Sequence, residues 1–342
     1  MNKKVIVAMS GGVDSSTVAL LLKNKGYQVQ GIFLDFFGDK KSIKDVREVS
    51  SKIEIPLEIV DASKDFKKKV VGYFLEELKN GNTPNPCVVC NKEIKFAIML
   101  QKMLEFKADY VATGHYARIA YRATRNVKRI NFGLFKAKDK NKDQSYFLYK
   151  LNQKELSKVM FPLGDYTKVE VRKMAKEFGL PVHDKKESQD ICFIPENGYE
   201  TFLKKSLKLK KGKICDLESS VLGKHDGLPL YTIGQRKGIK IGGNGPYYVI
   251  RKDFKKNILI VGVEKELLSR KIAIKDVNWV SSSPELPSKM LLRTRYRNPL
   301  VCGTIDKEGN LIFSKPQKAV TSGQSAVFYS KEGEVIGGGT IV

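Results

Sequence analysis

Residues 5–22 read V-I-V-A-M-S-G-G-V-D-S-S-T-V-A-L-L-L, and this stretch decides the fold. Val5 to Ala8 predict a strand and residues 17–22 predict a helix. Between them, two glycines let the backbone turn tightly and point N–H groups inward, while serine hydroxyls and the start of the helix add donors. The segment therefore predicts a phosphate-binding loop rather than a plain glycine turn. Its spacing lacks the lysine of a Walker loop, so it does not predict transfer of a γ-phosphate.

Short apolar strands and helices alternate along the first half of the chain. Strands are expected at 3–8, 28–33, 57–60 and 110–113, and helices at 15–24, 43–53, 66–79, 92–106 and 168–178. Apolar strands that alternate with helices are typical of a parallel sheet covered on both faces. We therefore expect an α/β domain over residues 1–195.

After residue 195 the sequence changes to glycines, tyrosines and short alternating runs, which predict mostly β structure. We divide this part into a middle domain at 196–270 and a C-terminal domain at 271–342, with the Ser- and Pro-rich stretch 279–286 at or near a linker. Residues 201–270 hold 16 Lys and Arg against 6 Asp and Glu. This concentration of positive charge suits a surface that follows an RNA backbone.

The whole chain is strongly basic, with 62 Lys and Arg against 37 Asp and Glu and a net charge of +25. Such a field attracts polyanions, so nucleic acid is the first partner to expect, the alternative being an organism with generally lysine-rich proteins. No long apolar run occurs, and the apolar stretch after Lys4 is too short for a signal peptide. We expect a cytoplasmic protein without a membrane segment.

The five cysteines do not suggest a disulfide framework in a cytoplasmic chain of 342 residues. Cys87 and Cys90 lie in the loop T-P-N-P-C-V-V-C, before a helix expected to begin at Lys92. A thiol at a helix N-terminus beside a lysine should have its thiolate favoured, which makes Cys90 a candidate nucleophile. Half of a zinc site is the alternative, although no second C-x-x-C exists. Composition alone allows Cys192 to be a buried core thiol.

At the glycine loop the chain resembles the PP-loop ATP pyrophosphatase superfamily, whose members adenylate a substrate oxygen and release pyrophosphate. Further motifs resemble the bacterial tRNA-specific 2-thiouridylase family and occur in its order: A-M-S-G-G-V-D-S-S, T-P-N-P-x-x-x-C-N-K-E-I-K-F, A-T-G-H-Y-A-R, K-D-Q-S-Y-F-L, C-F-I, G-Q-R-K-G-I and T-x-G-Q-S-A-V-F-Y. They extend from residue 8 to residue 329. The resemblance implies a PP-loop domain, a small β-rich middle domain and a C-terminal β-barrel.

The resemblance also implies a reaction, which is insertion of sulfur at C2 of the wobble uridine in tRNAs for Lys, Glu and Gln. ATP would adenylate the uridine O2, so that AMP becomes the leaving group. Cys192 matches the position that carries a persulfide and Cys90 the position of the nucleophile, and the two would close a transient disulfide once sulfur leaves. A cysteine desulfurase or sulfur-relay protein is the expected donor, and the enzyme is expected to be a monomer.

Two sets of binding residues follow from the same resemblance. The residues that match ATP contacts are Ala8, Met9, Ser10, Gly11, Gly12, Val13, Asp14, Ser15, Leu34 and Gly114. Asp14 is further expected to contact Mg²⁺ or water, and Gly114 to stand at the end of the fourth strand, where open α/β sheets bind ligands. The residues that match tRNA contacts are Asn85, Pro86, Cys87, His115, Lys142, Asp143, Gln144, Arg295, Tyr296 and Gln324.

The chain departs from the family pattern at two places. Cys87 stands where many relatives have an aspartate to which proton transfer is assigned, and a thiol does not simply replace a carboxylate. Cys87, Cys90 and Cys192 together open an alternative, an iron–sulfur cluster held by three thiolates, with no persulfide on Cys192. The second departure is the short region 35–44, where relatives often carry a longer insertion beside the adenine.

Two other functions compete with this interpretation. One is a PP-loop enzyme that adenylates a small molecule, such as an amidotransferase-coupled synthetase, which gains nothing from a charge of +25. The other is a non-catalytic RNA-binding protein with a vestigial nucleotide fold. An intact S-G-G-V-D-S loop beside Cys90 and Cys192 argues against such decay.

Overall fold

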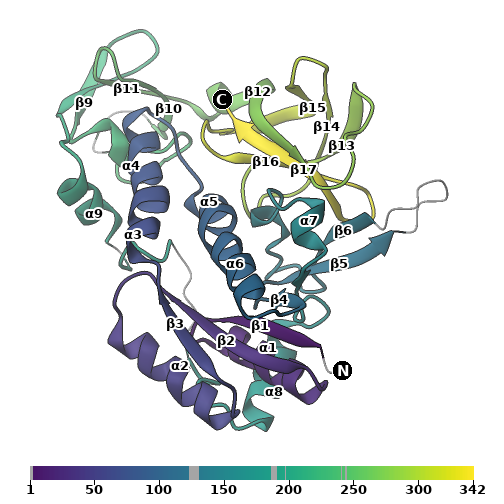
Figure 1. Cartoon of the computed structure of the whole chain (residues 1–342). Coiled ribbons are helices and arrows are strands. Elements are labelled where there is room, and N and C mark those ends of the chain that lie inside the picture. Colours follow the sequence, from purple (N-terminus) through teal and green to yellow (C-terminus); the bar gives the residue numbers. More distant parts are fainter. Residues whose placement is uncertain (1–2, 123–130, 186–190, 197, 240, 243–244) are drawn as a thin grey trace.

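The computed structural model describes residues 3–122, 131–185, 191–196, 198–239, 241–242 and 245–342. Figure 1 shows a parallel sheet with its helices, a small sheet beside α9 and a barrel that carries the C-terminus. Among the described helices, none is both long and apolar enough to cross a membrane.

The first sheet is parallel, as predicted, and has the order β3-β2-β1-β4-β7. Its strands are β1 Lys4–Met9, β2 Gln28–Asp35, β3 Leu57–Asp61, β4 Tyr110–Ala112 and β7 Val159–Met160. The helical segments before the small sheet are α1 Val13–Asn24, α2 Lys40–Lys52, α3 Ser63–Phe66, η1 Lys67–Val71, α4 Gly72–Lys79, α5 Pro86–Cys90, η2 Asn91–Phe96, α6 Ala97–Glu105, η3 Ser145–Phe147, α7 Gln153–Leu156, α8 Lys168–Glu177 and α9 Tyr199–Ser206. The α/β class is confirmed.

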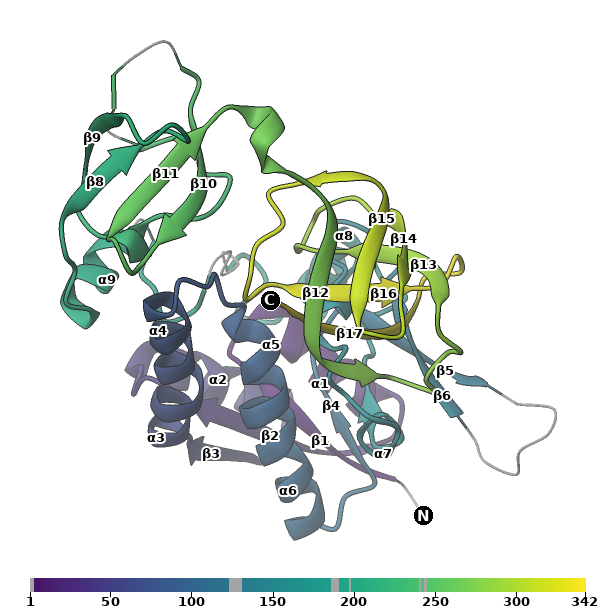
Figure 2. The ribbon, with the colours of Figure 1, turned by 90° about the horizontal axis from the view of Figure 1, so that it is seen from above.

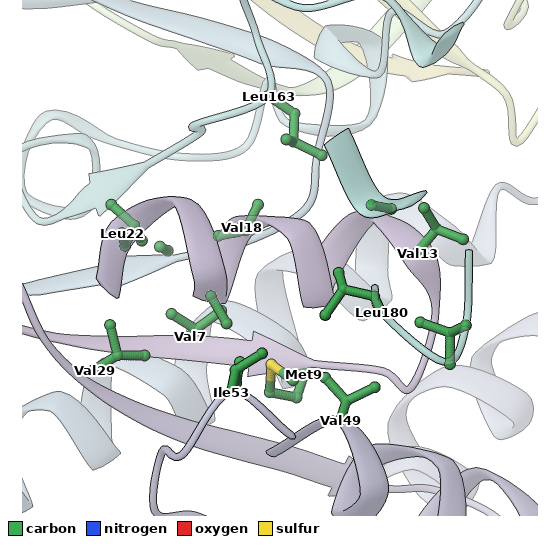
Figure 3. Packing of buried hydrophobic residues seen from close by; sticks show 14 of the residues in the cluster. Val7, Met9, Val13, Val18, Leu22, Val29, Val49, Ile53, Leu163 and Leu180 are labelled. Atoms are coloured by element: carbon green, nitrogen blue, oxygen red, sulfur yellow. The ribbon is translucent and has the colours of Figure 1, made fainter. Parts of the chain in front are cut away.

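Alternate residues of β1 enter two different cores. Val5 and Val7 pack with the apolar faces of α1, α2 and α8 (Figure 3). Ile6 points to the other face and joins Met99 of α6 and Tyr329 of the barrel in one cluster. Because strand side chains alternate between faces, a strand apolar at every position is buried on both sides. The second core therefore belongs jointly to the α/β part and the barrel.

The middle part is a four-stranded sheet of order β10-β11-β8-β9. Its strands are β8 Gly212–Cys215, β9 Val221–His225, β10 Tyr248–Asp253 and β11 Ile258–Gly262, with the short turns η4 Leu228–Leu230 and η5 Glu264–Leu267. Ile214, Val249 and Leu259 form its small core. This agrees with the β-rich middle part expected from the sequence.

Six strands close the C-terminal barrel, because β12 at one end of the order β12-β15-β14-β13-β16-β17 also pairs with β17. They are β12 Leu268–Trp279, β13 Ser288–Arg293, β14 Val301–Ile305, β15 Asn310–Lys318, β16 Ser325–Tyr329 and β17 Glu334–Ile341. The expected β-barrel is confirmed. The Ser- and Pro-rich stretch 279–286 joins β12 to β13 of the barrel, and the boundary expected at 270/271 falls within β12.

A hairpin from the α/β half extends the barrel sheet. Its strands are β5 Ala117–Arg122 and β6 Asn131–Lys136, and β6 pairs with β17 through Phe135 and Leu134. Figure 2 shows this hairpin projecting outward from the barrel. Sequence patterning did not predict this pairing, because its partners lie about 200 residues apart and neither strand encodes the identity of its neighbour.

Candidate active site

The phosphate-binding loop is a closed turn at the carboxyl end of β1. The backbone N–H of Ser10 donates to the Ser15 hydroxyl, at 3.0 Å, and the two serine hydroxyls lie 3.0 Å apart. Gly11 has a φ of +66°, and an alanine Cβ there would lie 3.1 Å from the carbonyl oxygen of Ser42. Gly12 then caps α1, whose first N–H groups face the turn. The loop predicted from the sequence thus forms at the start of a helix, where phosphate binds.

Two lysines that sequence analysis missed reach this loop. The Nζ of Lys168, the first residue of α8, lies 2.6 Å from the Asp14 carboxylate, which also accepts a hydrogen bond from Tyr116 at 2.9 Å. The Nζ of Lys185 donates to the Gly11 carbonyl at 2.9 Å and pairs with Asp45 at 2.5 Å. Both lysines lie more than 150 residues after the loop, so no local motif connected them to it.

The predicted ATP residues differ in how their side chains lie relative to the loop. Gly114 lies against the loop, since a Cβ there would come within 3.1 Å of the Asp14 Cβ and the Ser15 nitrogen. Met9 and Val13, in contrast, are buried in the core, so only their backbone groups face the turn. Leu34, at the end of β2, is half-buried. The carboxyl ends of β1, β2 and β4 therefore meet at one edge of the sheet, where ligands bind in such folds.

The helix around Cys90 differs from the prediction. It begins at Pro86 as α5 and continues through the π-helical segment η2 into α6, so Cys90 lies within the helical run rather than at its N-terminus. Lys92 is not free to act on the thiol, because its ammonium pairs with Glu155 at 2.7 Å. The prediction of a thiolate favoured by a helix start and by Lys92 is therefore wrong.

The environment of Cys90 favours the neutral thiol. Cys90 is 6% exposed and packs with Phe66, Val70 and Ile94. Burial raises its pKa to about 11, and the charge of Lys95 opposes this rise only in part. Burial raises the pKa of Cys87 as well, again against Lys95. An apolar surrounding penalises the charged form, and this effect outweighs the nearby lysine.

Cys192 completes a neighbourhood of three free thiols. It is an exposed residue, and its charge acts on the pKa of both Cys87 and Cys90. Phe193, the next residue, packs edge-on against Phe66 at 5.9 Å between ring centroids. Within the described residues, no three His, Cys, Asp or Glu side chains gather closely enough to hold a metal ion.

The barrel holds the cysteine loop in place. The Thr83 N–H donates to the carbonyl of Ser322 at 2.8 Å, and the side-chain amide of Gln324 donates to the Thr83 carbonyl at 2.7 Å. Between them, Gly323 has a φ of +89°, and a Cβ there would lie 2.9 Å from the Cβ of Asn82. Asn85 hydrogen-bonds the hydroxyl of Tyr146. Gln324, expected at tRNA, thus also positions the loop that carries Cys87 and Cys90.

Two of the predicted tRNA residues, the half-buried His115 and the buried Asp143, are engaged by other residues of the chain. His115 stacks on Phe96 at 5.9 Å, its Nδ1 lies 2.8 Å from the Thr113 hydroxyl, and burial lowers its pKa to about 3, which keeps it neutral. Asp143 is 3% exposed and lies 3.5 Å from Arg293 of the barrel.

Three further predicted tRNA residues differ in how far they are engaged by the protein. The Gln144 side chain accepts a hydrogen bond from the N–H of Tyr116 at 3.0 Å. Tyr296 packs on Phe147 with ring centroids 4.4 Å apart, and Arg295 beside it is exposed. Of these three, Arg295 presents its side chain most openly to a ligand.

The chain matches three family models in succession. A tRNA methyl transferase HUP domain matches residues 3–196, a tRNA methyl transferase PRC-barrel domain residues 200–263, and an aminomethyltransferase beta-barrel domain residues 269–341. A 4-thiouridine synthetase solved with RNA and bound ATP aligns over 59% of this chain and 49% of that chain, at 17% identity and a TM-score of 0.37. That similarity is too low to support a function.

Curated relatives match over essentially the full length. The tRNA-specific 2-thiouridylase of Halothermothrix orenii is 45% identical and covers 99% of this chain and 98% of its own. That of Legionella pneumophila strain Paris is 43% identical over 100% and 99%. With this similarity added to the loop, the three thiols and the barrel, the chain belongs to the tRNA-specific 2-thiouridylase family.

Proposed function

We propose that this chain is a tRNA-uridine 2-sulfurtransferase that uses ATP to activate the wobble uridine of tRNAs for Lys, Glu and Gln. One observation carries the proposal: the charge of Lys95 acts on the pKa of His115, beside the phosphate loop, and on the pKa of all three thiols. Gly114 contacts Asp14 and Ser15 of the loop, while its neighbour His115 stacks on Phe96 of the cysteine helix. An adenylated base at this edge lies between the two halves of the site.

In the first step the loop binds the phosphates of ATP, and the uridine O2 attacks the α-phosphate. Pyrophosphate leaves, its charge compensated by the helix start of α1 and by Lys168 and Lys185. Asp14 is the residue that would hold Mg²⁺, because its carboxylate remains 32% exposed. Bound Mg²⁺ would neutralise phosphate charge. The neutral ring of His115 adds no positive charge here.

In the second step sulfur replaces AMP. The terminal sulfur of a Cys192 persulfide attacks C2 of the uridine, and the C2–O bond breaks to release AMP. The Cys90 thiolate then attacks the Cys192 sulfur, which leaves 2-thiouridine and a Cys90–Cys192 disulfide. Two thiol electrons thereby reduce the transferred sulfur, and an external dithiol reductant restores the thiols. Cys90 is buried and Cys192 exposed, which suits a resolving thiol and a sulfur carrier that a donor must reach.

The iron–sulfur alternative has less support. A cluster needs its three thiolates gathered around one site, and the described arrangement of Cys87, Cys90 and Cys192 does not gather them. We route no step through a cluster. We further propose a cytoplasmic monomer that receives sulfur from a cysteine desulfurase or a sulfur-relay protein.

Release of labelled pyrophosphate from ATP tests this function. We expect release only when tRNA and the purified chain are both present, and 2-thiouridine only after a sulfur donor is added. Ser10→Ala and Asp14→Ala should abolish both products and leave tRNA binding largely intact, because the loop holds phosphate and the RNA is held elsewhere. Equal loss of tRNA affinity would contradict that division.

The same assay separates the competing functions. Pyrophosphate release without tRNA indicates a small-molecule synthetase, and tRNA binding without any release indicates a non-catalytic RNA-binding protein. Methyl transfer, which the family-model descriptions mention, requires no cleavage of ATP to pyrophosphate. It would leave a methylated rather than a thiolated nucleoside in the digested tRNA.

A further inference from the structure

An aromatic pocket of about 460 Å³ lies beside the cysteines, at the carboxyl ends of β2 and β3. Neither the proposed chemistry nor the expected tRNA contacts use it. Its lining combines five phenylalanine rings with lysines, and comprises Phe36, Phe37, Ser63, Lys64, Phe66, Lys67, Val71, Phe193 and Phe202. We call it the Phe37 pocket.

The turn that presents Phe36 and Phe37 is held in shape by the chain itself. The Asp35 carboxylate accepts hydrogen bonds from the N–H groups of Phe37, at 3.0 Å, and Gly38, at 2.8 Å. Phe36 stacks on Phe66 with centroids 4.5 Å apart and an interplanar angle of 17°. Phe37 nevertheless stays 52% exposed, an unusual state for a ring whose position is this well defined. The rings of Phe36 and Phe37 are therefore already positioned to contact a flat ligand.

The pocket shares a wall with the sulfur centre. Phe193, which follows Cys192, lines the pocket and contacts both Phe66 and Phe202. Phe66, which contacts Phe193, packs against the buried Cys90. A nucleic acid strand that delivers a base to these thiols therefore passes close to the Phe37 pocket.

The rim of the pocket is positively charged. Lys64 and Lys67, which line the pocket, are both exposed, and no ion pair engages either of them among the described residues. Asp65 is the only acid between these two lysines. Aromatic rings beside free lysines are the combination with which proteins hold single-stranded nucleic acids, the rings stacking on bases and the lysines meeting phosphates.

We propose that the Phe37 pocket binds an unpaired nucleobase of the substrate tRNA, next to the target uridine, with Lys64 and Lys67 on its phosphate. This inference rests on the proposed function. The base of ATP is a less suitable occupant. The ATP phosphates are expected at the loop after β1, beside Lys168 and Lys185, so they would not reach the lysines of the pocket. In an RNA strand, by contrast, every base has a phosphate next to it.

A double-mutant cycle between protein and RNA tests the proposal. The protein variants are Phe37→Ala and Phe37→Trp, with Phe106→Ala as a control for losing an exposed ring elsewhere. The RNA is an anticodon stem-loop with abasic nucleotides introduced one at a time on either side of the target uridine. Dissociation constants are measured for every pair, with the full chain and at one salt concentration.

We expect Phe37→Ala to weaken binding of the intact RNA about five- to tenfold, the loss of one stacked base. One abasic position should weaken binding to the wild-type protein by the same factor. The same abasic position should cause no further loss of affinity in Phe37→Ala. Phe37→Trp should retain affinity, and Phe106→Ala should be neutral. Lys64→Gln combined with Lys67→Gln should reduce the salt dependence of binding, whereas Lys173→Gln with Lys176→Gln on α8 should not.

Three results would overturn the proposal. If the loss of affinity from Phe37→Ala and the loss from an abasic nucleotide are additive at every position, Phe37 contacts no base. A raised dissociation constant for ATP alone identifies the pocket as the adenine site. Slower sulfur loading of Cys192 by a cysteine desulfurase, with unchanged RNA affinity, identifies it as a donor-docking surface. If instead the wild type fails to bind the stem-loop at all, the proposed function itself fails.

Discussion

Cys90 has a proposed role in sulfur transfer, yet burial raises the pKa of its thiol. Its thiol lies among apolar side chains, and Lys95 is the cation that acts on it. At neutral pH the resting enzyme therefore holds Cys90 as a thiol. Such a residue avoids reacting with small oxidants and alkylating agents, and it becomes reactive only when a persulfide or a bound base changes its surroundings.

The reactivity of Cys90 gives the first prediction. With a pKa of about 11, roughly a thousandth of Cys90 is thiolate at pH 8, against about a quarter of an unperturbed cysteine. Alkylation by iodoacetamide should therefore be about a hundredfold slower than for free cysteine, and should rise tenfold per pH unit up to pH 10. The measurement uses a variant with Cys87, Cys192 and Cys302 changed to serine. Lys95→Met should slow the reaction further and Lys92→Met should not. Alkylation at the rate of free cysteine would contradict the burial argument.

Cys87 gives the second prediction, which separates the two sulfur mechanisms. Cys90→Ser and Cys192→Ser should each eliminate 2-thiouridine by either route. In the persulfide route Cys87 carries no sulfur, so Cys87→Ser should keep part of the activity and Cys87→Asp, the residue common in the family, should keep most. Iron content is measured after anaerobic purification, and persulfide on Cys192 by mass spectrometry. Iron and thiolation lost together in Cys87→Ser, with no persulfide in the wild type, would favour the cluster.

At the scale of elements, the contact between the barrel and the cysteine loop connects two functions. The segment 321–324 reaches from the barrel to Thr83 through two hydrogen bonds, and Gly323 lets the two backbones approach closely. The helix that carries Cys87 and Cys90 starts three residues later. The barrel therefore sets the position of the thiols, and in the proposed function it also contributes surface for RNA.

The third prediction compares two glycines of the barrel. Gly323 and Gly309 both have a positive φ, +89° and +81°, so alanine costs about 1–2 kcal/mol of backbone strain at either. At Gly309 the new Cβ has room, its nearest contact being 3.6 Å, whereas at Gly323 it would collide with Asn82 and the backbone of Thr83. Gly323→Ala should lower thiolation at least about tenfold at temperatures where it remains folded, since small misplacements of catalytic groups cost that much. Gly309→Ala should lower only the melting temperature. Equal activity in both would show that the barrel does not position the loop.

At the scale of the whole molecule, the largest shared core and the excess positive charge lie on different parts of the chain. The α/β part and the barrel share a hydrophobic core, and Asp143 is buried against Arg293 between them. The middle sheet has its own small core and carries much of the excess positive charge. Much of the excess positive charge thus lies on a part of the chain that stands apart from the parallel sheet (Figure 1).

Salt dependence gives the fourth prediction. Binding of tRNA should weaken steeply with salt, with a log–log slope of roughly −0.7 for each single-stranded phosphate that is neutralised. Reversing the charge of Lys204, Lys205, Lys210 and Lys211 should make the slope shallower and weaken binding. Reversal of Lys40, Lys41, Lys173 and Lys176, on α2 and α8, serves as the control and should change little. A shallow slope in the wild type would show that the basic middle sheet does not meet RNA.

The sequence by itself determined the parallel sheet, the phosphate loop, the β-rich second half and the family. These depend on local patterns, such as alternating burial along strands and glycines at a strand–helix turn, which neighbouring residues specify. Only the tertiary structure decided which charges and rings surround the site. Lys168, Lys185 and Lys95 are ordinary lysines in the sequence, and the rings of the Phe37 pocket come from distant segments. The acidity of Cys90 was misjudged for the same physical reason: a pKa depends on burial and on groups brought close by folding, and neither is a property of the local sequence.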